Sequence, residues 1–218
     1  MVLYTISVLL GMIMQNISLV LEIFATISGL LQGVLVMLNK RSNWIFYILQ
    51  VVLLFFFSAI NRLYGDMTNN VIFLFMGIYG IIMWNKNNNN LPVTKLNRKD
   101  RYGYLLLLFF ATVITGFVLS CTADPLPWID AFTTVSAFFA TWFMANKKLD
   151  AWILWTVNDF IYVIEYALLP NPAYYLLGLN IVWTVMAIIS YLNWKHLINQ
   201  RSKDETNIAV ADIDRMCC

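Results

Sequence analysis

The sequence predicts an all-α integral membrane protein with seven transmembrane helices, arranged as two three-helix repeats joined by a single helix. Its 218 residues are 61% hydrophobic and only 12% charged, whereas about a quarter of the residues in a soluble domain are charged. All but one of its 14 Lys and Arg residues fall on one side of the predicted bilayer. Sequence blocks in the first half of the chain also recur in the second half.

The predicted helices are apolar runs of about 20 residues, the length that crosses the hydrocarbon core. Seven such runs lie at residues 19–38, 43–60, 67–84, 103–121, 128–146, 150–169 and 172–193. Backbone groups in lipid must be satisfied internally, so each run is expected to be helical. An eighth run, residues 1–18, contains the polar residues Thr5, Gln15 and Asn16. It is expected either to span the membrane or to lie along its interface.

The basic residues predict the orientation of the helices. They follow the first, third, fifth and last of the seven strong runs, and only Arg62 falls on the opposite side. The positive-inside rule makes the basic side the cytoplasm. Residues 85–102 are then a cytoplasmic loop between two halves, and residues 199–218 are a polar cytoplasmic tail, which we expect to be loose.

An internal repeat relates the two halves. Residues 43–50 align with 151–158 at an offset of 108, and Asn70 with Asn180 and residues 77–84 with 187–194 at an offset of 110. The repeats are residues 19–84 and 128–194, and the helix at 103–121 links them. An odd number of helices between equivalent elements gives both repeats the same orientation, as in the SWEET transporters. Chance recurrence of Trp and Asn is the alternative, which three aligned blocks make weaker.

Polar side chains within the predicted spans mark a candidate site, because such residues are costly in hydrocarbon. They are Gln50, Asn70, Asn158, Asp159 and Asn180. The spacing of Trp152, Trp155 and Asp159 is i, i+3, i+7, which places them on one helix face. Two indole rings and a carboxylate suit a flat organic ring that bears hydroxyls or a positive charge. The predicted substrate-binding set is Trp152, Trp155, Asn158, Asp159, Gln50, Asn70, Asn180 and Trp183.

Structural interpretations compete with this one. Amides between membrane helices often only join the helices, so Asn70 and Asn180 could be structural. Four tryptophans near helix ends are interpreted as interfacial anchors: Trp44, Trp84, Trp128 and Trp194. The chain has no metal-ligand spacing, nucleotide-binding loop or nucleophile motif, so we expect neither an enzyme nor a cofactor.

The sequence resembles the PnuC family of bacterial vitamin-precursor transporters. The matching stretches lie between about residues 40 and 195 and consist of residues 62–67, 78–84 and 127–134, together with Trp152-x-x-Trp155-x-x-x-Asp159. The resemblance implies a SWEET-like fold, assembly as a homotrimer and residence in the bacterial inner membrane. Trp152, Trp155 and Asp159 match the family motif and inherit a substrate-site role. Asn158 departs from the pattern, in which an apolar residue is frequent.

The resemblance also implies uptake of nicotinamide riboside for NAD biosynthesis. Transport in that family is facilitated diffusion, made one-way by a cytoplasmic kinase that phosphorylates the substrate. Relatives carry thiamine or riboflavin, and cation–π contacts would serve the pyridinium and the thiazolium alike. Our hypothesis is therefore a nicotinamide riboside uniporter. Thiamine or riboflavin transport, proton-coupled transport and a non-transporting scaffold or sensor are the alternatives.

Overall fold

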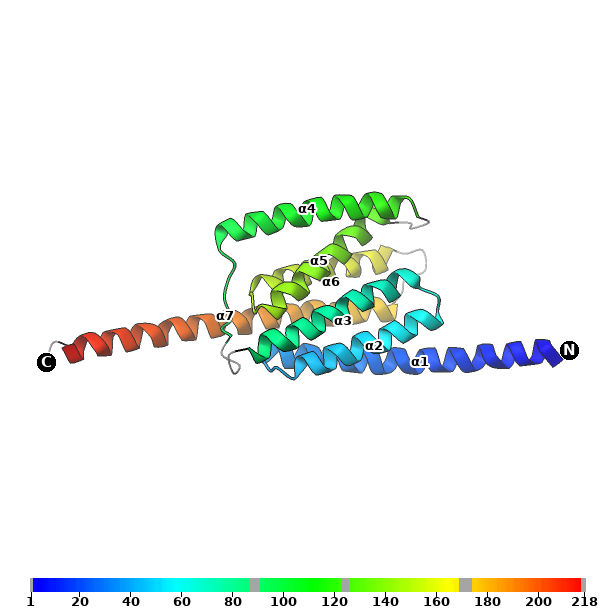
Figure 1. Ribbon diagram of the computed structural model, residues 1–218, viewed down its shortest axis with the longest axis horizontal. Coiled ribbons are helices and arrows are strands. Elements are labelled where there is room, and N and C mark those ends of the chain that lie inside the picture. Colours follow the sequence, from blue (N-terminus) through cyan, green and yellow to red (C-terminus); the bar gives the residue numbers. More distant parts are fainter. Residues whose placement is uncertain (1, 87–90, 123–125, 169–173, 217–218) are drawn as a thin grey trace. The chain divides into compact units, whose positions relative to one another are not determined.

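The computed structural model describes residues 2–86, 91–122, 126–168 and 174–216. Within these ranges it contains seven α-helices and no β-strand, apart from an isolated bridge between Thr94 and Lys148. Five of the helices are long and apolar enough to cross a membrane. The helices are α1 (Val2–Met37), α2 (Asn43–Ile60), α3 (Tyr64–Asn85), α4 (Arg98–Ser120), α5 (Pro127–Ala145), α6 (Asp150–Leu168) and α7 (Tyr174–Met216) (Figure 1).

Two units make up the chain, Met1–Asn89 and Asn90–Cys218. In the first unit, α2 packs against both α1 and α3. Glycines allow the close approach: a Cβ added to Gly29 of α1 would stand 2.5 Å from Nε2 of Gln50, and one added to Gly77 of α3 would stand 2.9 Å from the ring of Tyr47. Trp44 of α2 meets Trp84 of α3 edge-on, with ring centroids 6.0 Å apart.

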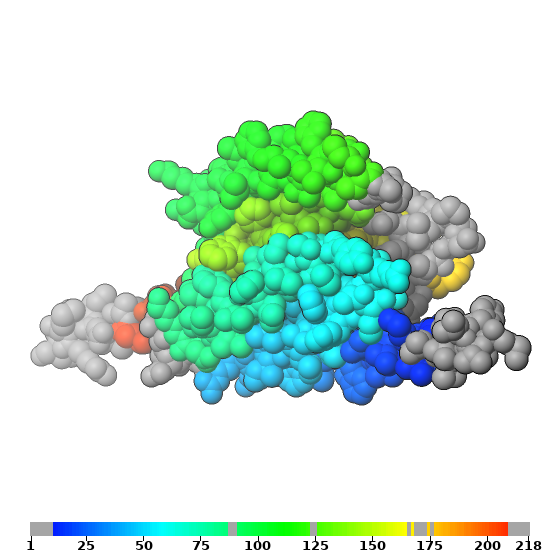
Figure 2. Space-filling view, turned by 45° about the vertical axis from the view of Figure 1, so that its right-hand side comes forward, coloured from blue at the N-terminus to red at the C-terminus, as the bar shows by residue number. Residues whose placement is uncertain are grey.

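In the second unit, α4 packs on α5, α5 on α6, and α6 on α7. Small buried residues of α5, including Ala137 and Ala140, allow close helix packing in the core of this unit. Helix α4 is different, because only 6% of its most hydrophobic stretch is buried. Its outward side chains lie uncovered in the space-filling view (Figure 2).

Three of the predicted interfacial anchors are instead core residues. Trp44, Trp84 and Trp194 are at most 1% exposed, and each packs edge-on against another aromatic ring. Edge-to-face packing of this kind stabilises buried aromatic pairs, so the indoles are held by neighbouring helices rather than at the membrane surface. Trp128 is 48% exposed and lies against Phe117 of α4.

The turns before α2 and α6 have the same backbone structure. Asn39 and Lys147 stand at an offset of 108 and have positive φ values of 54° and 49°. Five hydrogen bonds of the first turn recur in the second at that offset. Among them, the N–H of Lys40 donates to the carbonyl of Leu35, and that of Lys148 donates to the carbonyl of Phe143.

Two expected boundaries differ from the structure. Residues 2–18 do not form a separate element, because α1 runs without a break from Val2 to Met37. The expected loose tail is also wrong for residues 199–216, which continue α7 as helix. No Pro or Gly stands at residues 16–22, where the first boundary was expected, or at residues 195–216. Arg201 adds an i, i+4 pair with Glu205. Residues 217–218 of the tail and 87–90 of the predicted loop lie outside the described residues.

Candidate functional site

Helix α6 carries four of the eight predicted site residues. Its 19 residues include Asp150, Asp159 and Glu165, and it is not among the five apolar candidate spans. A helix that holds this much polarity in a membrane protein needs partners within the protein or a ligand.

The two tryptophans of the α6 motif have different surroundings. Trp152 is buried and meets Trp194 of α7 edge-on, with ring centroids 5.2 Å apart and planes at 89°. Its Nε1 is buried, and no acceptor for it lies among the described residues. Trp155, one helical turn further along, is half-buried. Trp152 thus takes part in helix packing, while Trp155 keeps more of its ring surface available.

Asn158 joins α6 to α5. Its Oδ1 accepts a hydrogen bond from Oγ of Ser136 at 2.7 Å, and both residues are buried. A side-chain hydrogen bond between membrane helices contributes about 0.6 kcal/mol. Sequence reasoning missed Ser136. The available signal was a serine inside an apolar helix, at the position that the offset of 108 relates to Ser28.

Asp159 is only 8% exposed. Within the described parts of the chain, no residue donates a hydrogen bond to its carboxylate or forms an ion pair with it. A buried carboxylate without a partner costs folding free energy. A buried acceptor of this kind, on the same face as Trp155, is what a ligand with hydroxyl or cationic groups would satisfy.

Asn180 and Trp183 lie on α7, the helix that packs against α6. Both are half-buried. The backbone carbonyl of Asn180 accepts a hydrogen bond from the hydroxyl of Thr184 at 2.8 Å. The second unit therefore holds six of the predicted residues on two packed helices.

Gln50 and Asn70 belong to the first unit. The amide of Gln50 lies against Gly29 of α1. Asn70 is buried, and its Nδ2 donates to the carbonyl of Asp66 one turn earlier in α3, at 2.8 Å. One donor of Asn70 is thus used by its own helix, whereas the structural role that the sequence left open was a link between helices.

No group of three His, Cys, Asp or Glu residues in the described ranges is placed to hold a metal ion. The groups that α6 and α7 offer are indole rings, amides and a carboxylate. These groups bind organic molecules through stacking, cation–π contacts and hydrogen bonds.

Comparison with known proteins gives a consistent picture. A family model described as nicotinamide mononucleotide transporter matches residues 19–196. The chain is 24% identical over 191 residues to a nicotinamide riboside transporter PnuC of Neisseria mucosa, covering 82% of this chain and 73% of that protein. It is 24% identical over 213 residues to the protein of the same name from Escherichia coli, covering 83% and 87%.

A solved structure has the same fold. The crystal structure of the vitamin B3 transporter PnuC superimposes with a TM-score of 0.64 at 23% sequence identity, covering 89% of this chain and 92% of that one.

Proposed function

The chain belongs to the nicotinamide mononucleotide transporter family, and on that premise we propose that it takes up nicotinamide riboside by facilitated diffusion. It is a multi-pass membrane protein with five long apolar helices in the described ranges. Curated relatives that carry the name nicotinamide riboside transporter match most of the chain. Transport, rather than catalysis, is the activity that this family membership supports.

The observation that carries the proposed site is the buried carboxylate of Asp159 beside Trp155 on α6. Nicotinamide riboside consists of a cationic pyridinium ring and a ribose with hydroxyl groups. The face of an indole ring attracts a cation with about 0.5–2 kcal/mol, and a carboxylate accepts hydrogen bonds from a diol. Trp155 would hold the ring, while Asp159 and the half-buried Trp183 and Asn180 of α7 would surround the rest.

The architecture that we propose is a SWEET-like 3+1+3 repeat, with α1–α3 and α5–α7 as the repeats and α4 as the link. Its support is the pair of matching turns before α2 and α6. The edge-on pair Trp44–Trp84 of the first unit also recurs as Trp152–Trp194 in the second. Movement of one repeat against the other would then alternate access to the substrate.

The membrane arrangement follows from the charge distribution. Nearly all Lys and Arg residues fall on one side of the predicted bilayer, so we place that side and the C-terminus in the cytoplasm of a bacterial cell. Assembly as a homotrimer and trapping of the substrate by a cytoplasmic kinase belong to the same proposal.

The test is uptake into liposomes that contain the purified full-length protein. Nicotinamide riboside, thiamine and riboflavin are offered separately, with and without a nicotinamide riboside kinase and ATP inside. We expect nicotinamide riboside to enter fastest and to accumulate only with the kinase. Faster uptake of thiamine or riboflavin would overturn the substrate assignment, and the absence of flux for all three would favour the scaffold or sensor.

A further inference from the structure

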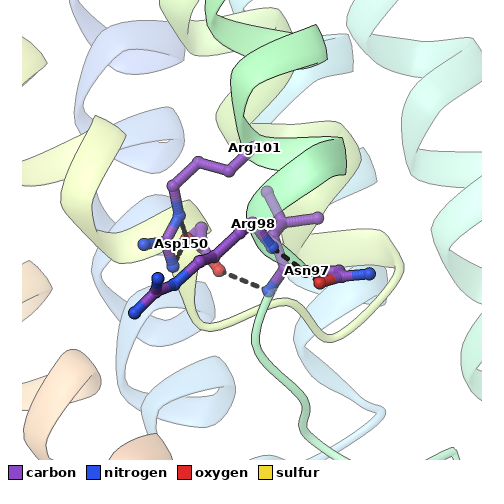
Figure 3. A network of polar contacts seen from close by, with 5 residues as sticks. Asn97, Arg98, Arg101 and Asp150 are labelled. Atoms are coloured by element: carbon purple, nitrogen blue, oxygen red, sulfur yellow. Dashed lines mark hydrogen bonds and ion pairs between the residues drawn. The ribbon is translucent and has the colours of Figure 1, made fainter.

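Residues 94–96, which lead into α4, form hydrogen bonds with the turn between α5 and α6. Thr94 pairs with this turn through two backbone hydrogen bonds, one from its N–H to the carbonyl of Lys147 and one to its carbonyl from the N–H of Leu149. The carboxylate of Asp150 accepts a hydrogen bond from the N–H of Leu96 at 2.8 Å and pairs with the guanidinium of Arg101 at 2.7 Å (Figure 3). These contacts fix the basic end of α4 within the second unit.

A cavity of about 140 Å³ lies directly beyond this ion pair. Helix α4 packs on α5, and none of its described Cα atoms comes within 8 Å of α6, so side chains fill the space between α4 and α6 only in part. The wall is apolar, with Arg101 and Asp150 as the charged residues at one end. Its other members include Tyr104, Leu105, Leu108, Phe143, Ile153 and Leu154. An apolar cavity of about 150 Å³ accepts a guest the size of benzene.

The charged end of the cavity favours an anion. Asp150 occupies one edge of the Arg101 guanidinium, but the Arg101 side chain remains 47% exposed and has further N–H donors. Arg98 and Lys99 are exposed on the same first turn of α4, and Asp100 offsets one of their charges. A phosphate group at this end would meet net positive charge and the N-terminus of a helix.

We propose that this cavity binds an anionic phospholipid, with its phosphate at Arg101 and a section of one acyl chain between α4 and α6. Helix α4 is an apolar span that is almost entirely unburied within this chain, and we take lipid rather than a second copy of the chain to cover it. The cavity joins an apolar wall to a basic end, which matches the two parts of a phospholipid. The proposal depends on the membrane location of the chain and not on the identity of its substrate.

The experiment counts the lipids that the purified full-length protein retains in native mass spectrometry. Phosphatidylglycerol and phosphatidylethanolamine with matched acyl chains are added in parallel. We expect about tenfold greater retention of phosphatidylglycerol, because phosphatidylethanolamine has the same phosphate but also carries an ammonium group, which the net positive charge at this end of the cavity disfavours. Leu105→Trp fills the cavity and should lower phosphatidylglycerol retention about tenfold. Leu107→Trp is the matched control, because Leu107 is equally exposed (54% against 52%) but does not line the cavity.

If Leu105→Trp does not fold, Ile153→Trp on the opposite wall replaces it, with Val157→Trp of the same helix as its control. Equal retention of the two lipids would overturn the proposal. So would an equal loss in the cavity and control variants, which would indicate general lipid contact. Displacement of the lipid by soluble glycerol phosphate would point to a headgroup site alone. Dissociation of an oligomer by Leu105→Trp, with lipid retention unchanged, would assign the cavity to a second copy of the chain.

Discussion

Helices α2 and α6 each follow a turn with a positive φ residue, and each has in its first turn a tryptophan that meets a tryptophan of the next helix edge-on. One turn further, Tyr47 of α2 is equivalent in the repeat to Trp155 of α6. After one more turn, Gln50 is equivalent to Asn158. The next position differs in residue type. Val51 of α2 is buried and apolar, whereas its equivalent in α6 is the buried carboxylate Asp159.

This difference separates the residues that build the fold from those that carry the proposed chemistry. A valine in the core adds stability, while a buried carboxylate without a protein partner lowers it. The features common to α2 and α6 are those of the scaffold. The features found only in α6, namely a larger indole and a carboxylate, are those that we assign to the substrate.

The largest expected effect comes from giving α6 the residue of α2. Asp159→Val should lower nicotinamide riboside uptake in liposomes more than about tenfold, because hydrogen bonds to a charged group contribute about 1.5–3 kcal/mol. Its thermal stability should not fall, since a buried unpaired carboxylate is removed. Asp204→Asn, at an exposed position of α7, is the control and should transport normally. Unchanged uptake by Asp159→Val would remove Asp159 from the site.

The second comparison replaces the indole of α6. Trp155→Ala should weaken nicotinamide riboside binding about tenfold, which corresponds to about 1.4 kcal/mol of cation–π and stacking contact. Trp155→Tyr, which copies Tyr47 of α2, should retain part of this affinity. Isothermal titration calorimetry measures both variants. Phe160→Ala changes an exposed aromatic residue of the same helix, and an equal loss in that variant would contradict a specific role for Trp155.

The smallest expected effect concerns the link between α5 and α6. Ser136→Ala removes the hydroxyl that bonds to Asn158 and should lower stability by about 0.6 kcal/mol, a shift of a few degrees at most in a thermal unfolding scan. Ser28→Ala makes the same change at the equivalent position of α1, where no hydrogen bond to a described residue is lost, and should cost less. A larger loss for Ser28→Ala would reverse the comparison.

Sequence reasoning predicted much of the fold because apolar length and basic turns are local signals. The run at residues 43–60 coincides with α2, and the spacing of Trp152, Trp155 and Asp159 places them on one helix, as predicted. The continuity of α1 was missed because the polar residues Gln15 and Asn16 were read as the edge of a separate segment. A few polar residues do not end a helix in the absence of a capping residue. The helical tail was missed because polar composition alone does not distinguish a solvated helix from a loose segment.

The site was less predictable, because its details depend on pairs of helices. Ser136 could not be matched to Asn158 without knowing how α5 packs on α6. The packing of Trp152 against Trp194 likewise depends on tertiary structure. It gives the two tryptophans of the α6 motif different roles, because Trp152 packs between helices while Trp155 is more accessible. A lone carboxylate within an apolar run was visible from the sequence, and Asp159 was found for that reason.

A structure of the protein with nicotinamide riboside bound tests the central claim most directly. Our account predicts the pyridinium ring over the indole of Trp155, within about 6 Å of its centroid. It also predicts a ribose hydroxyl within hydrogen-bond distance of the carboxylate of Asp159. A bound substrate that touches neither Trp155 nor Asp159 would contradict the assignment of the transport chemistry to α6.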